Sequence, residues 1–232
     1  MLDEIVGPVV YKKSIDELTG KQLAQYRTQR IRVNLNEQEQ ADYDTAHAVY
    51  MGYVREARLR ESYVPAWWDE FTRRSDYDPG ARRAKVAELK LKEIVNQARA
   101  KLDILEQLLR EHYNRQMLVF TAHNRFAYTI SRQYLIPVIT HQTKAAERKT
   151  ILENFQSRAY RAIVTTRVLN EGVDVPAAKI AVVLGGTAGA REYIQRLGRV
   201  LRKQDNIEAV LYEVIVRKTV DEGIAQRRKP AM

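Results

Sequence analysis

The first half of the chain shows the apolar spacing of long α-helices. Between residues 37 and 112, apolar residues recur every three or four positions, as they do along one face of an amphipathic helix. This spacing predicts one helix over 37–62 and a second over 81–112, joined by an aromatic-rich loop over 64–80. Asn36 and Glu39 match a capping box, which marks the start of the first helix. The sequence therefore predicts a projection built from two long helices.

The second half changes to short apolar runs that alternate with helical patterns. Runs of four to eight apolar residues predict buried strands, and the predicted strands are 117–121, 136–140, 162–166, 180–184 and 209–216. The helices predicted between them are 124–134, 144–157 and 190–201. Strands without polar alternation, separated by helices, indicate an α/β fold in which a parallel sheet has helices on both faces. Ligands of such sheets lie at the carboxyl ends of the strands.

The two ends of the chain are less regular. Residues 9–11 and 30–35 are typical of short strands, and residues 14–18 suggest one helical turn between them. These pieces cannot close a hydrophobic core by themselves, so we expect them to pack against another domain or partner. The tail, residues 217–232, is expected to be a basic helix or a frayed end.

Composition and charge restrict the chemistry. The 232 residues include 39 Lys and Arg, 29 Asp and Glu, four His and no Cys, with a formal net charge of +10. Disulfides, thiolate nucleophiles and zinc sites with Cys ligands are therefore excluded, and no His-rich metal cage is expected. No apolar run approaches the roughly 20 residues of a membrane span, and the first residues lack signal-peptide features. The positive charge suggests a polyanionic partner such as nucleic acid, although it also suits an ordinary basic protein.

The most informative segment follows the fourth predicted strand. Gln195, Arg199 and Arg202 are four and three residues apart, so they lie on one face of the predicted helix. Two guanidinium groups held close together repel each other unless an anion lies between them, and Arg binds phosphate oxygens in bidentate fashion. The spacing indicates a phosphate-binding face, and a solvated basic surface is the alternative.

A second informative segment, residues 165–176 (TTRVLNEGVDVP), directly follows the third predicted strand. Hydroxyl and backbone N–H groups at the end of a strand can hold phosphates. Gly172 permits close approach, and Asp174 can accept hydrogen bonds from a ribose hydroxyl. An ordinary strand-to-helix turn in which Asp174 is a cap would explain single residues but not the whole string.

Together these segments resemble motifs V and VI of superfamily 2 helicases, in the form found in the XPB family of DNA repair helicases. The strings are residues 165–176 and residues 193–202 (YIQRLGRVLR). Residues 118–124 (LVFTAHN) resemble motif IV, and residues 140–143 (THQT) resemble the segment after the next strand of that family. The resemblance implies a RecA-like fold over about 117–216. It extends more weakly over the opening residues.

The resemblance also implies an incomplete motor. No phosphate loop of the GxxxxGK[ST] type and no DExH segment is present in the 232 residues. Superfamily 2 motors hydrolyse ATP, with Mg²⁺, between two RecA-like domains, and this chain resembles only the second. We therefore expect it to be the C-terminal half of an ATP-dependent DNA helicase or translocase. We expect ATP and Mg²⁺ to be bound mainly by the first motor domain, and the chain alone to be inactive as an ATPase.

The family roles carry over onto matching positions. Arg199 and Arg202 would be arginine fingers that stabilise the transferring phosphoryl group, and Gln195 would position their helix. The residues expected to contact nucleotide or relay its state are Gly172, Asp174 and Arg196. The residues expected to contact the DNA backbone are Thr121, Asn124, His141, Thr143, Thr165 and Thr166. Each of these polar side chains could instead be an ordinary helix cap or strand-end hydroxyl.

The helical projection corresponds in this resemblance to the thumb-like insertion of XPB, which helps to grip DNA. Its candidate DNA contacts are Arg73, Arg74, Trp67 and Trp68, within a wider set of arginines near its tip: Arg55, Arg58, Arg60, Arg82 and Arg83. The tryptophans could stack on bases or act as a wedge at a junction. Alternatively, they seal the tip of the projection or a partner interface.

The resemblance divides the chain into four parts. They are a connector or edge of the preceding motor domain (1–36), a thumb-like insertion with a lead-in helix (37–112), the second RecA-like domain (113–216) and a basic tail (217–232). The expected partners are DNA, the N-terminal motor half, and a companion nuclease or a TFIIH-like complex, in the cytoplasm of a prokaryote or the nucleus of a eukaryote. The alternatives are a non-catalytic DNA or protein docking module, and another superfamily 2 translocase of the restriction-motor or branch-migration type.

Overall fold

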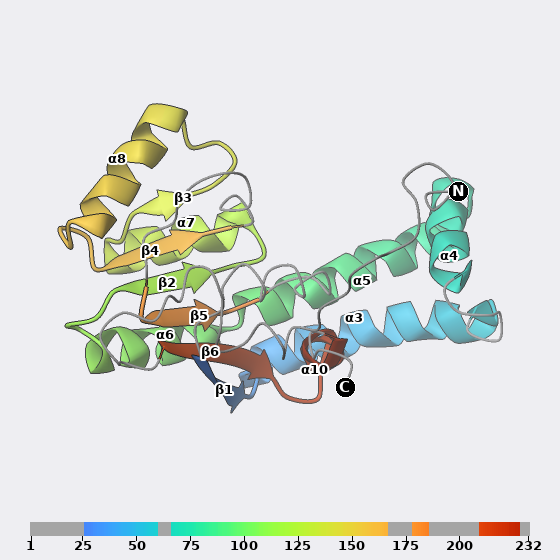
Figure 1. Cartoon of the computed structure of the whole chain (residues 1–232). Helices are drawn as coiled ribbons and strands as arrows, with labels where there is room; N and C mark the ends of the chain where they lie inside the picture. The colour runs from blue at the N-terminus through green and yellow to red at the C-terminus, as the bar shows by residue number, and fades with distance from the viewer. Residues whose placement is uncertain (1–25, 60–65, 167–177, 186–208, 228–232) are drawn as a thin grey trace, which may run out of the picture.

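Six parallel strands form one sheet, in the spatial order β1-β6-β5-β2-β4-β3 (Figure 1). The computed structural model describes residues 26–59, 66–166, 178–185 and 209–227. The strands are β1 (Tyr26–Val33), β2 (Met117–Phe120), β3 (Val138–Ile139), β4 (Ala162–Thr165), β5 (Ile180–Val183) and β6 (Ala209–Val216). Every pairing between neighbouring strands is parallel. The predicted parallel sheet is confirmed.

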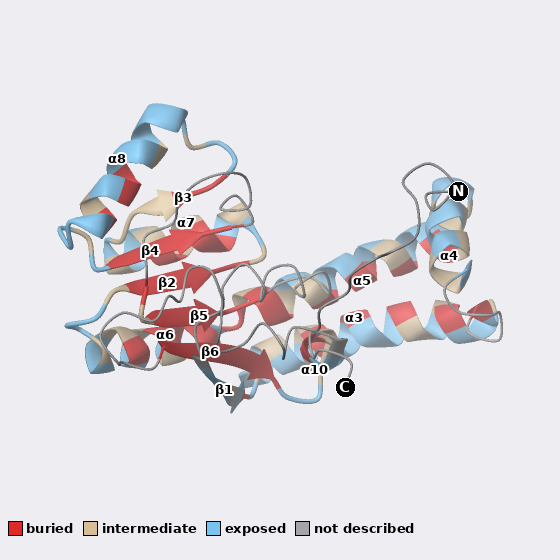
Figure 2. Ribbon diagram, in the orientation of Figure 1, coloured by how far each residue is buried: buried red, intermediate tan, exposed pale blue. Residues whose placement is uncertain are grey.

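The central strands are buried on both faces, which explains why they are continuous apolar runs. In β2, Met117 and Val119 belong to one hydrophobic core, whereas Leu118 and Phe120 belong to the other. All four residues of β2 are buried (Figure 2). Successive side chains of a strand point to opposite faces, so an apolar residue is required at each position.

Helices cover both faces of this sheet, as predicted. On one face lie α6 (Arg99–Glu111) and α7 (Asn124–Tyr134), which share the larger core with β2. On the other face, α8 (Ala145–Gln156) packs with Ile151, Leu152 and Phe155. In the described part of the chain, no helix is long and apolar enough to cross a membrane.

Strand β1 corrects the prediction for the first 36 residues. We expected this segment to belong to the edge of a preceding motor domain, but β1 pairs with β6 along eight residues of each strand. Arg30 Nε also donates to Glu213 Oε2 of β6 at 2.8 Å. Residues 26–33 are therefore the edge strand of this sheet. The predicted strand over 9–11 and the helical turn over 14–18 lie outside the described residues.

The projection consists of α3 (Glu37–Glu56), α4 (Ala66–Tyr77) and α5 (Pro79–Gln97), and it extends beyond the carboxyl ends of the strands (Figure 1). The capping box is confirmed, because Asn36 Oδ1 accepts from Glu39 N at 2.8 Å and Asn36 N donates to Glu39 Oε2 at 3.1 Å. Two other predictions are wrong. The first helix ends at residue 56 rather than 62, and most of the predicted aromatic loop is the helix α4, which packs against α5 and buries Phe71.

The predicted helix over 81–112 is also two helices, α5 and α6, which meet at Ala98. Ala98 has an extended conformation (φ −51°, ψ 131°), and its side chain cannot cap the helix that follows. Glu39 supplies the missing acceptor: its Oε1 accepts from Arg99 N at 2.8 Å while its Oε2 caps α3. One carboxylate therefore satisfies N–H groups at the starts of two helices, which a local reading of the sequence could not reveal.

A buried ion pair joins the base of the projection to the end of the sheet. Lys101 Nζ of α6 lies 2.7 Å from Asp221 Oδ2 of α10 (Val220–Arg227), with side-chain exposures of 0% and 3%. The same carboxylate oxygen accepts from Val216 N at 3.1 Å, at the end of β6. Val220 N also donates to the Tyr43 hydroxyl of α3 at 2.9 Å. A helix is thus present in the predicted tail over residues 220–227, but with Asp221 and Glu222 against Arg227 it is not basic. These contacts attach it to α3, α6 and β6.

Lys101→Met should therefore destabilise the protein strongly. The substitution leaves the carboxylate of Asp221 buried without its cation, which costs about 3–5 kcal/mol in comparable cases. Urea unfolding of the two proteins measures the difference. Arg99→Met is the matched control, because Arg99 pairs with Asp103 in the same helix while both side chains are about 60% exposed, and its loss should cost about 1 kcal/mol or less. Equal effects of the two substitutions would contradict the assigned role of the pair.

Candidate functional site

Polar side chains gather where β2, β3 and β4 end. Thr121 follows β2, His141 follows β3 after one residue, Thr165 ends β4 and Thr166 follows it. The three strands are neighbours in the sheet, so their carboxyl ends share one edge. Backbone hydrogen bonds continue past the strand ends, since Thr121 N donates to Thr165 O at 3.0 Å and Thr166 N to Ile139 O at 3.2 Å. We call this region the carboxyl edge.

Asn124, at the start of α7, connects two of these strand ends. Its Nδ2 lies 3.0 Å from His141 Nδ1, and its Oδ1 accepts from Thr166 Oγ1 at 3.1 Å. An amide NH₂ group can only donate, so in this arrangement His141 Nδ1 accepts and the imidazole carries its proton on Nε2. His141 is exposed. The cluster therefore holds a histidine that has an N–H donor left for a ligand.

The predicted threonines differ in their access to solvent. Thr165 is fully buried, and its hydroxyl donates to Thr166 O at 2.9 Å. Thr143 Oγ1 accepts from Thr140 N at 2.9 Å, and the hydroxyl of Thr121 donates to His123 O at 3.3 Å. These hydroxyls stabilise the turns at the strand ends. The direct phosphate contact expected of Thr165 is not supported by this geometry.

Two helices begin at the carboxyl edge without a side-chain cap. The N-cap residues are His123 for α7 and Lys144 for α8, both in the extended region, and neither makes a capping hydrogen bond. The first N–H groups of a helix have no acceptor within the helix, and the helix dipole adds partial positive charge there. Two such N-termini beside exposed His141 give the edge several donors suited to anions.

A tyrosine outside the sequence motifs supports this cluster. The Tyr128 hydroxyl lies 3.2 Å from Thr140 Oγ1 and 3.4 Å from Gln142 Oε1, and Thr140 is completely buried. Tyr128 follows Asn124 by four residues and thus lies on the same face of α7. That helical spacing is the signal that could have found it.

The base of the projection touches the carboxyl edge at two points. Arg125 Nη1, in the first turn of α7, lies 3.1 Å from Glu93 Oε1 of α5. Near the end of α5, the side chain of Asn96 packs against Gly185, which follows β5. A Cβ atom at position 185 would lie only 2.4 Å from Asn96 Oδ1. A larger residue at position 185 would therefore force the side chain of Asn96 to move.

At the tip of the projection, the predicted contact residues have partners within the protein. Arg73 and Arg74 both pair with Glu70, and the hydrogen bonds from Arg74 and then Arg73 lower the pKa of this carboxyl. The Arg73 side chain nevertheless remains 72% exposed. The two arginines lie on one helix, where they can still present charge to a ligand.

The two tryptophans pack against each other and against Phe71. The Trp67 and Trp68 rings meet edge to face at 5.5 Å, and the Trp68 ring lies 5.6 Å from the Phe71 ring. Lys85 Nζ lies 3.9 Å from the centroid of the Trp68 ring, and burial lowers the pKa of Lys85. One face of Trp68 is therefore covered. This geometry favours the interpretation that Trp68 seals the tip over the interpretation that it stacks on bases.

The residues expected to contact nucleotide lie outside the described residues. They are Gly172, Asp174, Gln195, Arg196, Arg199 and Arg202. Within the described ranges, no group of three or more His, Asp or Glu residues could hold a metal ion. The N–H donors of the carboxyl edge suit anions.

Comparison with known proteins assigns a domain and relatives. Residues 100–204 match the family model of the helicase conserved C-terminal domain, starting just after the break at Ala98. The chain is 37% identical over 228 residues to the DNA 3'-5' translocase XPB2 of Sulfurisphaera tokodaii, covering 97% of this chain and 51% of that protein. It is 32% identical over 138 residues to the DNA 3'-5' helicase XPB of Mycobacterium tuberculosis, covering 59% and 25%. The chain thus spans about half the length of the first relative.

Solved structures show the same fold at low sequence identity. The C-terminal part of the Fun30 ATPase domain has a TM-score of 0.62 and 13% identity, with 91% of each chain covered. The Sulfolobus solfataricus SWI2/SNF2 ATPase core in complex with dsDNA has a TM-score of 0.62 and 17% identity, covering 97% of this chain and 48% of that one. These likenesses show the fold: the arrangement of sheet and helices is shared with these ATPase domains.

The contact between α5 and the carboxyl edge can be tested with Gly185→Ala. The added methyl group clashes with Asn96, and overpacking of this kind costs about 1–3 kcal/mol. Combining it with Asn96→Ala should recover part of the loss, as urea unfolding of the single and double variants would show. Gly52→Ala is the control, because a methyl group added there, inside α3, would meet no atom within 4 Å, and it should stabilise by up to about 1 kcal/mol. Additive effects at 96 and 185 would contradict the contact.

Proposed function

The chain corresponds to the C-terminal half of an XPB-type helicase, and we propose that it supplies the DNA-backbone grip and the arginine fingers of an ATP-dependent DNA translocase. The observation that carries the proposal is the Asn124-centred cluster between the starts of α7 and α8. It supports binding of successive phosphates without reading bases, which is what a motor that moves along any sequence requires.

The backbone grip would use donors that differ in kind. His141 would donate from Nε2 to one phosphate, with its orientation fixed by Asn124. Uncapped N–H groups at the starts of α7 and α8 would donate to the neighbouring phosphates. Thr121 and Thr166, which are only 5% and 7% exposed, would position the turns, and Thr143 would do the same. At the carboxyl edge, Asn124, His141 and the helix N-termini would therefore be the groups that meet DNA directly.

The nucleotide-facing residues would lie on the two motif segments. Arg199 and Arg202 would stabilise negative charge on the transferring phosphoryl group, a contribution of about 10³–10⁵ in rate in related systems. Gln195 would position their helix, while Gly172, Asp174 and Arg196 would contact nucleotide or relay its state. ATP and Mg²⁺ would be held mainly by a first motor domain, so no ATPase is expected from these 232 residues alone.

The projection would act as a thumb that is fixed to the grip. The Glu93–Arg125 pair and the Asn96–Gly185 contact attach α5 to the carboxyl edge. Arg73 and Arg74 would contribute charge at the far end, where they would contact the DNA backbone. A companion nuclease or a TFIIH-like complex would be the protein partner, and the complex would work with DNA in a prokaryotic cytoplasm or a eukaryotic nucleus.

The finger assignment predicts a selective loss of activity. Arg199→Ala and Arg202→Ala, each in the full-length protein, should lower DNA-stimulated ATP hydrolysis by about 10³-fold or more, because charge in the transition state loses its partner. DNA affinity at fixed salt should remain within about twofold of the wild-type value, a range of about 0.4 kcal/mol. Steady-state ATPase assays and fluorescence anisotropy with labelled DNA measure the two quantities.

The two outcomes separate the proposal from its alternative. Wild-type turnover by the double variant would contradict the finger assignment. A non-catalytic docking module would also give no ATPase stimulation when the first motor domain is added in trans to the wild-type chain.

The grip assignment predicts the opposite pattern for Asn124→Ala. Removal of the amide frees His141 and Thr166, so DNA affinity of the full-length protein should fall about tenfold, or about 1.4 kcal/mol. ATP hydrolysis at saturating DNA should change much less. Fluorescence anisotropy at one salt concentration measures the affinity, since phosphate contacts depend strongly on salt. Gln156→Ala, exposed at the far end of α8, is the control, and an equal affinity of Asn124→Ala and wild type would contradict the grip.

A further inference from the structure

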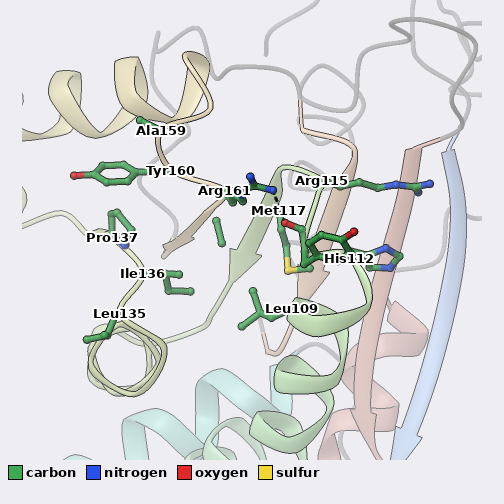
Figure 3. Close-up of a pocket in the computed structure, with 12 residues that line it drawn as sticks. Leu109, His112, Arg115, Met117, Leu135, Ile136, Pro137, Ala159, Tyr160 and Arg161 are labelled. Carbon is green, nitrogen blue, oxygen red and sulfur yellow. Dashed lines mark hydrogen bonds between the residues drawn. The ribbon is translucent and has the colours of Figure 1, made fainter.

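A pocket lies at the opposite edge of the sheet, where β2 and β4 begin. Its volume is about 320 Å³, within the range of small binding pockets. Leu109, Met117 and Ile136 provide apolar lining, as Figure 3 shows. Arg115 and Arg161 lie on its upper side in that view. None of the residues assigned to DNA or nucleotide belongs to this lining.

Leu135 makes the rim of the pocket unusual. This residue follows the last residue of α7 in the left-handed conformation (φ 53°, ψ 38°) and is 89% exposed. The conformation is unfavourable for leucine because its Cβ approaches the following carbonyl oxygen, and glycine is the usual residue at this point of a helix. Exposure of the side chain to water adds a second cost. A contact that covers Leu135 in a complex would explain both features.

A second exposed hydrophobic side chain lines the same pocket. Tyr113, just after α6, is 71% exposed. Its carbonyl oxygen accepts a hydrogen bond from Arg161 Nη1 at 2.7 Å, which ties the end of α6 to the start of β4. The rim is therefore held in place before any partner binds. A preformed site loses less conformational entropy on binding.

The charge around the pocket is positive. Arg115 and Arg161 are both exposed, and neither forms an ion pair with a carboxylate in the described part of the chain. His112 also lines the pocket; burial lowers its pKa, so it is neutral at pH 7 and adds no charge there. Two guanidinium groups beside an apolar floor complement a ligand that combines carboxylates with a large apolar side chain.

We propose that this pocket docks a short acidic segment of a partner protein, which inserts one apolar side chain between Leu135 and Met117 and presents carboxylates to Arg115 and Arg161. The floor formed by Leu109, Met117 and Ile136 favours an apolar side chain of a protein segment over a phosphate, because burying a charged group against apolar side chains is costly. The pocket lies at the edge opposite to the proposed DNA grip. A partner bound there would leave the carboxyl edge free.

The test is fluorescence anisotropy of labelled eight-residue peptides with the full-length protein. One panel carries a central Leu, Phe, Met or Trp between acidic residues, and a second panel carries the same centres between lysines. A third peptide is acidic with a serine centre. At least one acidic and apolar peptide should bind with a Kd of about 100 μM or tighter, while the basic panel and the serine peptide should bind at least tenfold more weakly.

Two substitutions locate the binding on the protein. Leu135→Gly removes the apolar rim and also relieves the left-handed conformation, so the Tm should stay the same or rise while peptide affinity falls at least fivefold. Arg115→Glu should lower affinity at least tenfold. The matched controls are Arg58→Gly, which relieves a positive φ of 47° outside the pocket, and Arg83→Glu on the projection. Both should bind peptide as the wild type does.

Other results overturn the proposal. They are absence of binding by every acidic peptide at about 1 mM, equal binding of the acidic and basic panels, and unchanged affinity in Leu135→Gly and Arg115→Glu. If the pocket variants instead lose affinity for a short single-stranded DNA, the pocket is a nucleic-acid site. None of these results depends on ATP hydrolysis or on the DNA affinity of the Asn124 variant. The peptide-docking proposal and the proposed function can therefore fail independently of each other.

Discussion

The buried pair of Lys101 and Asp221 is the constraint on which the junction of sheet and projection depends. An ammonium and a carboxylate withdrawn from water must meet, because either one alone would be too costly to bury. The requirement brings the start of α6 to the start of α10, 120 residues later. Asp221 also binds the backbone of Val216, and Val220 binds Tyr43. The end of β6, the first turns of α3 and the projection are thereby fixed to one another.

The two edges of the sheet follow from the direction of its strands. All six strands are parallel, so the turns after β2, β3 and β4 collect polar residues and helix N-termini at one edge, close to the projection. The opposite edge receives the ends of α6 and α7 with the residues that start β2 and β4. One edge therefore offers donors to anions, whereas the other offers an apolar pocket with arginines.

The long, periodic elements could be predicted from the sequence, and the breaks between them could not. Helix α7 and strand β6 have the predicted bounds, because each has a strong pattern of apolar residues. The break at Ala98 left no local signal, since alanine is the best helix former. It depends on Glu39, which lies 60 residues before its partner Arg99. Strand β1 was assigned to the wrong neighbour for the same reason: its alternating pattern specifies a strand but not the strand that pairs with it.

The candidate site was predictable as a location, and less so as a set of contacts. The motif strings placed six polar residues at strand ends, and the structure brings all six to one edge. Whether each of these side chains can reach a ligand depends on how deeply it is buried. Thr165 and Thr166 lie at the end of a central strand, so their hydroxyls find partners inside the protein, whereas His141 follows the short edge strand β3 and stays exposed. Asn124 connects the buried and the exposed residues, because its Oδ1 accepts from buried Thr166 and its Nδ2 donates to exposed His141. The orientation of the exposed imidazole is thus fixed by hydrogen bonds that begin inside the sheet, so it is set by the packing of the core and not by solvent.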